Sequence, residues 1–123
     1  MLRKACRKFQ NNGFKDTAFY LVSADSLPFY DKAFDVCICH LSFNFFPDLI
    51  KVIQEISRVT GDKAIFLGSV PVPEKNQINS KIRGQLYSEN ELKTFFEEEG
   101  WNFKTFPLEN GCLLYFRAEK SRE

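Results

Sequence analysis

The sequence has 123 residues, of which 44% are apolar and 14 are phenylalanine. This length allows one domain with a single hydrophobic core, which we assign to residues 1–123. Seventeen basic and 16 acidic residues give a formal net charge of +1, so charge does not support binding to nucleic acid through its phosphates. Because no apolar run approaches the roughly 20 residues that span a bilayer, we expect no membrane segment, no signal peptide and a cytoplasmic location.

The chain opens with a short amphipathic segment, residues 1–9, that predicts a helix. Its apolar residues fall on one helical face: Leu2, Ala5, Cys6 and Phe9. Asn-Asn-Gly at residues 11–13 is typical of the left-handed cap that ends a helix. A basic amphipathic start also occurs in mitochondrial presequences and membrane-surface helices. We favour a surface helix packed on a sheet, because the apolar stripe and the cap both fit it.

Two apolar runs, residues 19–22 and 34–40, predict strands. The first run, FYLV, is aromatic and β-branched, as in a buried strand. The second run, FDVCICH, is apolar on both faces, which is typical of a central strand covered on both sides in a parallel sheet. Small hydrogen-bonding residues at 23–26 end the first predicted strand and begin a loop. Pro28 then keeps the path extended, because proline has no N–H to donate to a ladder.

The rest of the chain predicts a crossover and then an antiparallel ribbon. A helix begins at Pro47-Asp48 and ends before Gly61, and a strand follows at residues 63–69, so the two predicted strands should be parallel. Residues 70–87 form either a lid or binding loop, or a surface loop without a role. A capping box at residues 88–91 begins a helix that runs to Gly100. Residues 101–106 and 112–117 then predict strands joined through an Asn-Gly hairpin turn.

Three pieces of this sequence, taken together, resemble a known family. They are Asp25-Ser26-Leu27-Pro28-Phe29, Phe34-Asp35-Val36, and the helix end Glu55-Ile56-Ser57-Arg58-Val59. Their order and spacing are similar to the middle and C-terminal part of class I S-adenosylmethionine-dependent methyltransferases of the type 11 kind. The resemblance implies an α/β fold: a truncated Rossmann-like sheet, mostly parallel with a C-terminal antiparallel hairpin, and helices on both faces. Residues 1–123 would correspond to the C-terminal two-thirds of the family fold.

The resemblance also implies S-adenosylmethionine as the cofactor, but two of the family's binding elements have no counterpart in this sequence. In the family, a glycine-rich strand-to-helix turn and an acidic residue that binds the ribose precede the part that begins here at Met1. Such contacts are worth about 4–7 kcal/mol, which is a factor of about a thousand or more in affinity. We therefore expect weak cofactor binding by this chain alone.

By resemblance, five residues belong to the retained cofactor site. Asp25 would accept a hydrogen bond from the adenine amino group, and the backbone of Ser26 and Leu27 would meet the ring edge. His40 and Leu41 would line the loop beside the methyl donor. For Asp25 the alternative is an Asx turn or helix cap. His40 is a candidate general base, but a hydrogen-bonded structural role is the preferred interpretation, so the catalytic residue stays unknown.

The sequence does not identify the methyl acceptor, although aromatic residues are candidates for the walls of its pocket. These candidates, for which core packing is the alternative, are Phe43, Asn44, Phe45 and Tyr87. We expect no metal site. A zinc site using Cys39 and His40 is the alternative, but Cys37 and Cys39 are better interpreted as buried structural thiols.

The family's two missing strands would lie between residues 19–22 and 34–40. Removing them leaves two strand edges unpaired, so we expect these strands to pair with each other or across a homodimer. Two functions remain open: an S-adenosylmethionine-dependent methyltransferase or its C-terminal portion, and a catalytically inactive methyltransferase-like module that acts by binding another protein.

Overall fold

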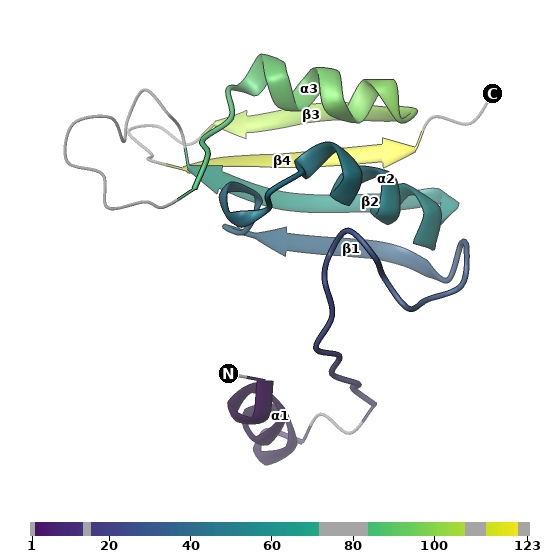
Figure 1. The fold of residues 1–123 in the computed structure, drawn as a ribbon, viewed down its shortest axis with the longest axis vertical. Helices are drawn as coiled ribbons and strands as arrows, with labels where there is room; N and C mark the ends of the chain where they lie inside the picture. Colours follow the sequence, from purple (N-terminus) through teal and green to yellow (C-terminus); the bar gives the residue numbers. More distant parts are fainter. Residues whose placement is uncertain (1, 14–15, 72–83, 108–112, 121–123) are drawn as a thin grey trace.

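The computed structural model describes residues 2–13, 16–71, 84–107 and 113–120. In chain order its elements are helix α1 (Leu2–Asn11), strand β1 (Phe34–His40), the short 3₁₀ helix η1 (Phe43–Phe45), helix α2 (Leu49–Val59), strand β2 (Thr60–Pro71), helix α3 (Glu89–Glu98), strand β3 (Trp101–Pro107) and strand β4 (Leu113–Lys120). The strands form one sheet in the order β1-β2-β4-β3, drawn in Figure 1.

Strand pairing confirms the predicted crossover and the predicted ribbon. β1 and β2 are parallel, with α2 between them in the chain, and Ile38 lies opposite Leu67. β4 is antiparallel to both β2 and β3. The fold is therefore the predicted α/β class, but among the described strands parallel pairing is confined to β1 and β2, so the sheet is not mostly parallel as predicted. The predicted Asn-Gly turn at residues 110–111 and most of the predicted lid lie outside the described residues.

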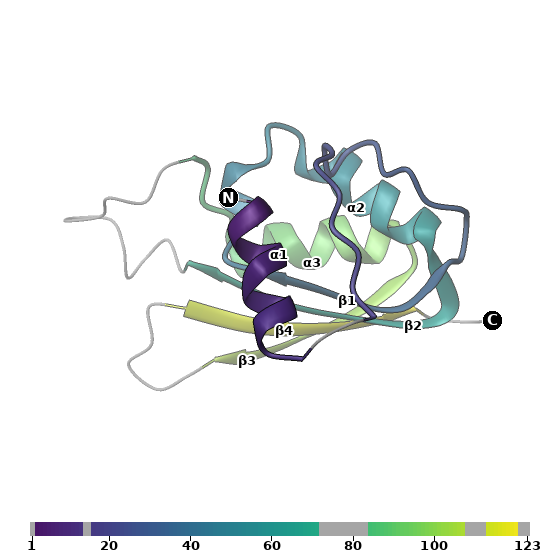
Figure 2. The same cartoon turned by 90° about the horizontal axis from the view of Figure 1, so that it is seen from below.

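Helices α2 and α3 lie on the same face of the sheet, as Figure 2 shows, so the described elements do not cover both faces as predicted. α2 begins where the Asp48 side chain accepts a hydrogen bond from the Lys51 N–H at 3.2 Å. Its buried stripe is Leu49, Val52, Ile53, Ile56 and Val59. α3 begins with the predicted capping box, in which the Ser88 and Glu91 side chains each accept from the other's backbone N–H. Both helix starts are therefore determined by local hydrogen bonds that the sequence predicts.

The core between these helices and the sheet is aromatic. The Phe66 and Phe96 rings, from β2 and α3, lie 5.3 Å apart edge to face. The Phe66 and Phe116 rings are stacked at 5.6 Å between neighbouring strands. Trp101 packs on both Phe66 and Phe96, and its indole N–H donates to the Ser57 hydroxyl at 2.6 Å. Edge-to-face and offset contacts are the arrangements that aromatic quadrupoles favour.

Two expectations about the strands are wrong. β1 is not a central strand: it lies at one edge of the described sheet, and the Ile38 side chain on its uncovered face is 70% exposed. Residues 19–22 form no strand, and Leu21 is 89% exposed. Direct pairing of residues 19–22 with residues 34–40 is therefore also wrong. An apolar run is suited to a strand, but it forms one only where a neighbouring strand supplies the hydrogen bonds.

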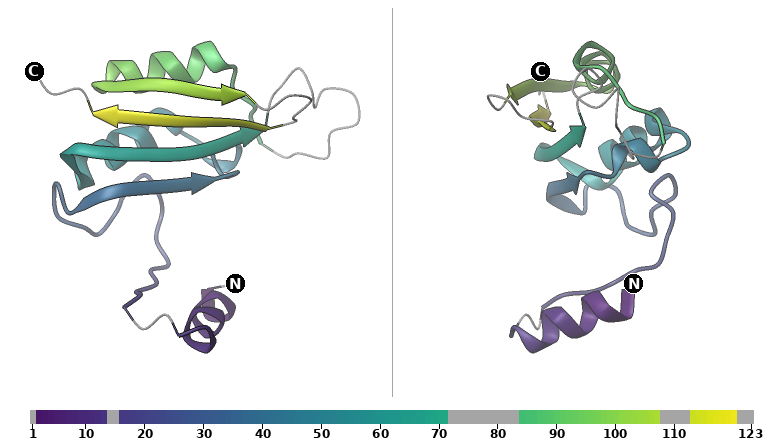
Figure 3. Two further views of the ribbon diagram at one scale, coloured as in Figure 1. Left: turned by 180° about the vertical axis from the view of Figure 1, so that it is seen from behind. Right: turned by 90° about the vertical axis from the view of Figure 1, so that its left-hand side faces the viewer.

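The first helix forms as predicted but does not pack on the sheet. α1 has no buried residue, and Figure 3 shows it standing apart, beyond the β1 edge. Its cap has the expected geometry, with Gly13 at φ +83°. The Phe9 and Phe19 rings meet edge to face at 5.4 Å, which joins α1 to the extended segment that follows. Among the described residues, no helix is long and apolar enough to cross a membrane.

Candidate functional site

The carboxyl ends of the two parallel strands bring His40 and Ser69 side by side. His40 ends β1 and lies opposite Ser69 on β2. The Ser69 hydroxyl and the imidazole Nδ1 are hydrogen-bonded. In open α/β sheets, ligands bind outside the carboxyl ends of the strands. The carboxyl ends of β1 and β2 are therefore the place where the sheet positions side chains for function.

The chain turns sharply immediately after His40. Leu41 adopts φ +53°, in the left-handed region that non-glycine residues rarely occupy. Its N–H donates to the Ser69 carbonyl at 3.0 Å, and the Ser42 hydroxyl donates to the His40 carbonyl at 3.1 Å. These bonds hold the turn against β2. Unusual backbone conformations of this kind concentrate at functional sites.

Asp25 lies in a local turn. The Ser23 hydroxyl donates to Asp25 Oδ1 at 2.6 Å, and the Ser26 N–H donates to the Ser23 carbonyl at 3.1 Å. The Asp25 carboxylate thus accepts from a hydroxyl, whereas an Asx turn or a helix cap uses a backbone N–H. Among the described residues, no hydrogen bond joins the Asp25 side chain to His40 or Leu41. The role of Asp25 in adenine binding stays a prediction.

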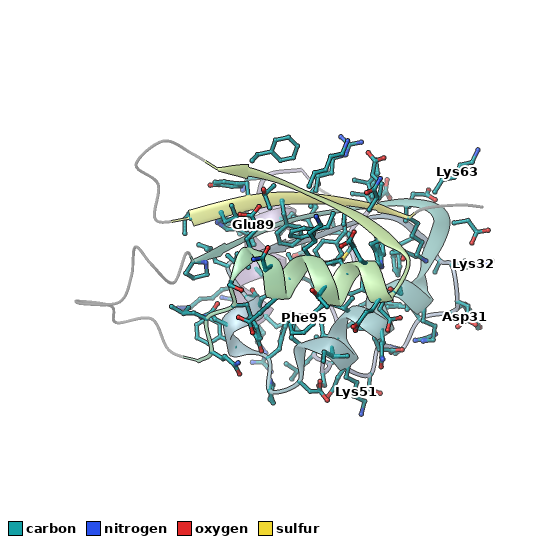
Figure 4. All side chains as sticks on the ribbon, turned by 90° about the horizontal axis from the view of Figure 1, so that it is seen from above. Asp31, Lys32, Lys51, Lys63, Glu89 and Phe95 are labelled. Carbon is teal, nitrogen blue, oxygen red and sulfur yellow. The ribbon has the colours of Figure 1, made fainter. Side chains whose placement is uncertain are left out.

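The loop that contains Asp25 is tied to α2 by Glu55 and Arg58, which we call the loop clamp. Glu55 Oε2 accepts the Leu27 N–H at 2.5 Å. The Arg58 guanidinium donates to the Leu27 carbonyl at 2.9 Å and to the Phe29 carbonyl at 2.8 Å, and it forms an ion pair with Asp31 at 2.8 Å. Figure 4 shows Asp31 beside Lys32, where the loop reaches the end of α2. One helix turn therefore holds the loop at residues 27–31.

The two clamp residues also bind each other. Arg58 Nε donates to Glu55 Oε1 at 2.5 Å. Hydrogen bonds from Arg58 and from the Leu27 N–H lower the pKa of Glu55 to about 2, and the same carboxylate raises the pKa of Arg58. Both groups therefore stay charged, and charge-assisted hydrogen bonds are the stronger kind. The Leu27 N–H and carbonyl are both used by the clamp, and their predicted contact with the adenine ring stays a prediction.

The candidates for the acceptor pocket lie in different environments. Phe43 is 1% exposed and packs among the core rings, as the alternative interpretation expects, whereas Phe45 is 61% exposed. Asn44 is buried, and its backbone carbonyl accepts the Gln85 N–H at 2.9 Å. Burial raises the pKa of Tyr87, which lies against Phe95. The structure thus brings η1 next to the segment that precedes α3, but the substrate roles stay predictions.

The cysteines of β1 are structural thiols, as predicted. Cys37 and Cys39 are partly buried against the core and are not bonded to each other. Burial raises the pKa of Cys37 to about 12 and that of Cys39 to about 11. Neither is therefore a thiolate near neutral pH. Within the described ranges, no three histidine, cysteine or acidic side chains are grouped so that they could hold a metal ion.

Sequence reasoning missed the roles of Ser69, Glu55 and Arg58. The spacing of Glu55 and Arg58, three residues apart on a helix, indicates an ion pair, but nothing local indicates that this pair would hold a loop nearly 30 residues earlier in the chain. Ser69 carried no signal, because a serine near the end of a predicted strand is common.

The chain matches a family model described as a methyltransferase domain over residues 1–107. The chain belongs to the methyltransferase domain family. It is 33% identical over 67 residues to a protein of Bacillus subtilis named uncharacterized methyltransferase YcgJ. That match covers 54% of this chain and 26% of the relative, so it spans about a quarter of the relative's length.

Solved structures share the fold at low sequence identity. The crystal structure of YcgJ from Bacillus subtilis has a TM-score of 0.84 at 16% identity, over 100% of this chain and 79% of that chain. A SAM-dependent methyltransferase from Aquifex aeolicus has a TM-score of 0.81 at 17% identity, over 98% of this chain and 63% of that chain. The class I methyltransferase assignment is therefore confirmed, and S-adenosylmethionine is the cofactor of that class.

The fold alone does not determine the reaction. The [4+2]-cyclase SpnF also matches, with a TM-score of 0.80 at 15% identity over 97% of this chain and 62% of that chain. One fold can host different chemistries, because activity depends on the site residues. The activity of this chain therefore depends on its own site residues.

Proposed function

We propose that this chain takes part in methyl transfer from S-adenosylmethionine to an acceptor, as the part of a methyltransferase that holds the adenine side of the donor. The loop clamp is the observation that carries the proposal. Two charged side chains of α2 hold the loop at Leu27, two residues after Asp25, through hydrogen bonds to its backbone. A binding loop needs such support, because recognition requires groups held in place before the ligand arrives.

The described residues fit one part of S-adenosylmethionine and leave the rest without a cradle. The loop before β1 contains a half-buried carboxylate, Asp25, that can accept from the adenine amino group. The strand-to-helix connection after β1, residues 41–48, contains no glycine, so its backbone cannot form the glycine-rich turn that approaches a ligand closely. We infer that a tight donor site requires this turn from sequence outside these 123 residues or from a partner.

The chain's own residues have two roles in the proposed reaction. When bound, S-adenosylmethionine supplies an electrophilic methyl group. Asp25 orients the adenine end, beside Ser26 and Leu27, whose N–H groups are already bonded to the Ser23 carbonyl and to Glu55. His40 and Leu41 line the part of the site at the carboxyl end of β1. The predicted cytoplasmic location stays a prediction.

Isothermal titration of the purified chain with S-adenosylmethionine and S-adenosylhomocysteine tests the proposal. We expect millimolar affinity, because the missing contacts are worth a factor of about a thousand. Asp25→Ala should weaken binding further, whereas Asp16→Ala, which changes an exposed aspartate outside the loop, should leave it unchanged. Equal binding by both variants would contradict the role of Asp25. No binding up to tens of millimolar ligand would favour the second candidate below.

The exposed edge of β1 favours a second candidate, a module that binds another protein by strand addition. Among the described strands, β1 pairs with β2 alone. Its uncovered face presents Val36 and Ile38, and the strand contains no proline or lysine of the kind that protects natural edges. We propose that a second copy of this chain occupies the edge, because identical strands can pair antiparallel about a two-fold axis.

Sedimentation velocity over a range of concentrations tests the dimer. We expect a concentration-dependent dimer that Ile38→Lys weakens by tenfold or more, because the lysine places a charge on the pairing strand. Tyr30→Lys is the matched control, since Tyr30 is exposed but lies in the loop before β1. A monomer at all concentrations would contradict the dimer, as would equal weakening by the two variants.

A further inference from the structure

Ser69 is a buried polar residue whose hydroxyl has one partner. It lies near the carboxyl end of β2, opposite His40 on β1 and Tyr115 on β4. Its side chain is 1% exposed, whereas His40 is exposed. Within the described part of the chain, the only hydrogen bond of the Ser69 hydroxyl is with His40 Nδ1. The Ser69 carbonyl is used separately, by the Leu41 N–H.

The hydroxyl and the imidazole can share this hydrogen bond in two ways. If the imidazole carries its proton on Nδ1, then Nδ1 donates and the buried hydroxyl hydrogen has no acceptor. If the proton is on Nε2 instead, the hydroxyl donates to Nδ1 and every polar atom of the pair is satisfied. Leaving a buried donor unsatisfied is unfavourable by a factor of about 5 to 150 in an equilibrium. The pair therefore favours the Nε2–H form of His40.

We infer that Ser69 is a positioning residue that holds His40 in the Nε2–H tautomer, so that the imidazole presents a hydrogen-bond donor at the carboxyl ends of β1 and β2. Nε2 lies on the ring edge opposite Nδ1 and therefore points away from the buried hydroxyl. A neutral imidazole in this form offers no lone pair at Nε2 and cannot take a proton there. His40 therefore acts as a donor to an oxygen acceptor of a bound molecule, such as a carboxylate or carbonyl, and not as a general base.

This inference deepens the proposed function, since it assigns the kind of contact His40 makes at that site. It does not need a bound cofactor to be tested. The turn after His40 supports it, because the Ser42 hydroxyl donates to the His40 carbonyl and the Leu41 N–H donates to Ser69. These two bonds hold the backbone on both sides of the pair. The ring orientation therefore does not depend on a ligand.

Nitrogen NMR of the imidazole tests the inference directly. The chain has one histidine, so the long-range ¹H–¹⁵N spectrum contains the signals of His40 alone. At about pH 9, where an imidazole is neutral, we expect Nε2 to appear as the protonated nitrogen and Nδ1 as the unprotonated one. A spectrum with the proton on Nδ1 would overturn the inference, whether or not the chain binds S-adenosylmethionine.

Matched serine variants separate positioning from general folding. Ser69→Ala removes the donor, and we expect the fraction of the Nδ1–H form to rise severalfold. Ser88→Ala removes a hydroxyl that caps α3 and has no contact with His40, and should leave the tautomer ratio unchanged. Ser69→Thr keeps the hydroxyl and should restore the wild-type ratio. Equal ratios in the wild type and Ser69→Ala would overturn the role of Ser69. If Ser69→Ala does not fold, Ser69→Cys, which keeps only a weak donor, replaces it, and a ratio equal to that of the wild type would overturn the role of Ser69 in the same way.

A functional test measures methyl transfer by this chain together with the glycine-rich turn that the proposed function requires. His40→Gln keeps a side-chain N–H donor but loses the ability to take a proton. We expect His40→Gln to retain turnover within about tenfold of the wild type and His40→Ala to lose considerably more. Equal loss in both variants, together with a pH profile that flattens in each, would identify His40 as a base and would overturn the donor assignment.

Discussion

Gly68 in β2 is a position where a single methyl group should destabilise the whole sheet. A Cβ atom built at Gly68 would lie 2.3 Å from Cζ and 2.6 Å from Cε2 of the Phe116 ring, and 3.0 Å from the Cys39 carbonyl oxygen. Normal contacts between carbon atoms are about 3.5–4.0 Å, so the Phe116 ring must move by more than 1 Å. Gly68→Ala therefore tests whether β2 and β4 are packed as the structure describes.

The Phe116 ring has little room for such a movement. It is stacked on Phe66 and lies 5.2 to 5.6 Å, between ring centroids, from Phe43, Phe96 and Phe103. Forcing extra volume into a packed core typically costs about 1–3 kcal/mol. We expect Gly68→Ala to lie toward the upper end of that range, because four neighbouring rings would have to shift together.

Gly61→Ala is the matched control in the same strand. A Cβ at Gly61 would meet nothing closer than 3.8 Å. We therefore expect no destabilisation, and up to about 1 kcal/mol of stabilisation through reduced entropy of the unfolded chain. Urea unfolding can be followed by the fluorescence of Trp101, the only tryptophan, which is 2% exposed. Equal midpoints for the two alanine variants would refute the packing argument.

A double variant identifies the Phe116 ring as the cause. Phe116→Leu removes the ring atoms that the new methyl group would meet, so the cost of Gly68→Ala should be smaller in that background. Directly contacting residues typically couple by about 0.5–3 kcal/mol. If the two effects instead add within about 0.5 kcal/mol, the destabilisation would come from the strand backbone and not from the ring.

Three further predictions concern the clamp, the thiols and a helix cap. The pKa of Glu55 is lowered from 4.5 to about 2, so the stability that Glu55 contributes is present above about pH 4.5 and is lost as the pH falls toward 2. Glu55→Gln should reduce this acid sensitivity, measured by urea unfolding between pH 2 and 6. The exposed Glu98→Gln should leave the acid sensitivity unchanged. Burial raises the pKa of Cys37 and Cys39 to about 12 and 11. Iodoacetamide at about pH 8 should therefore label these thiols only after unfolding, as peptide mass spectrometry would detect. Rapid labelling of the native chain would contradict their burial. Ser88→Ala removes the α3 cap and should lower the free energy of unfolding by about 0.5–2 kcal/mol, whereas an unchanged urea midpoint would mean that packing alone holds this helix end.

The sequence by itself determined the features that depend on near neighbours in the chain. The starts of α2 and α3 follow from Asp48 and Ser88, whose side chains accept from backbone N–H groups three residues later. The parallel crossover and the antiparallel ribbon follow from the lengths and order of apolar runs. The spacing of Asp25, Phe34 and the end of α2 was sufficient to identify the family. All of these signals lie within one element or between successive elements, where local physics dominates.

Only the tertiary structure decided which strands have partners. The run at residues 34–40 is apolar on both faces, but it lies at the sheet edge, and residues 19–22 form no strand. Periodicity reports how apolar each face is and not whether another strand is there to pair with it. A strand forms only when its backbone groups find hydrogen-bond partners, and those partners are distant in sequence.

The same reason explains the missed site residues. Ser69 meets His40 because β1 and β2 are parallel and in one register. Glu55 and Arg58 hold the loop around Leu27 because α2 folds back over it. Phe43 lies in the core because η1 directs it between two layers. Each residue type is ordinary in the sequence, and its role arises from a long-range neighbour that only the folded chain supplies.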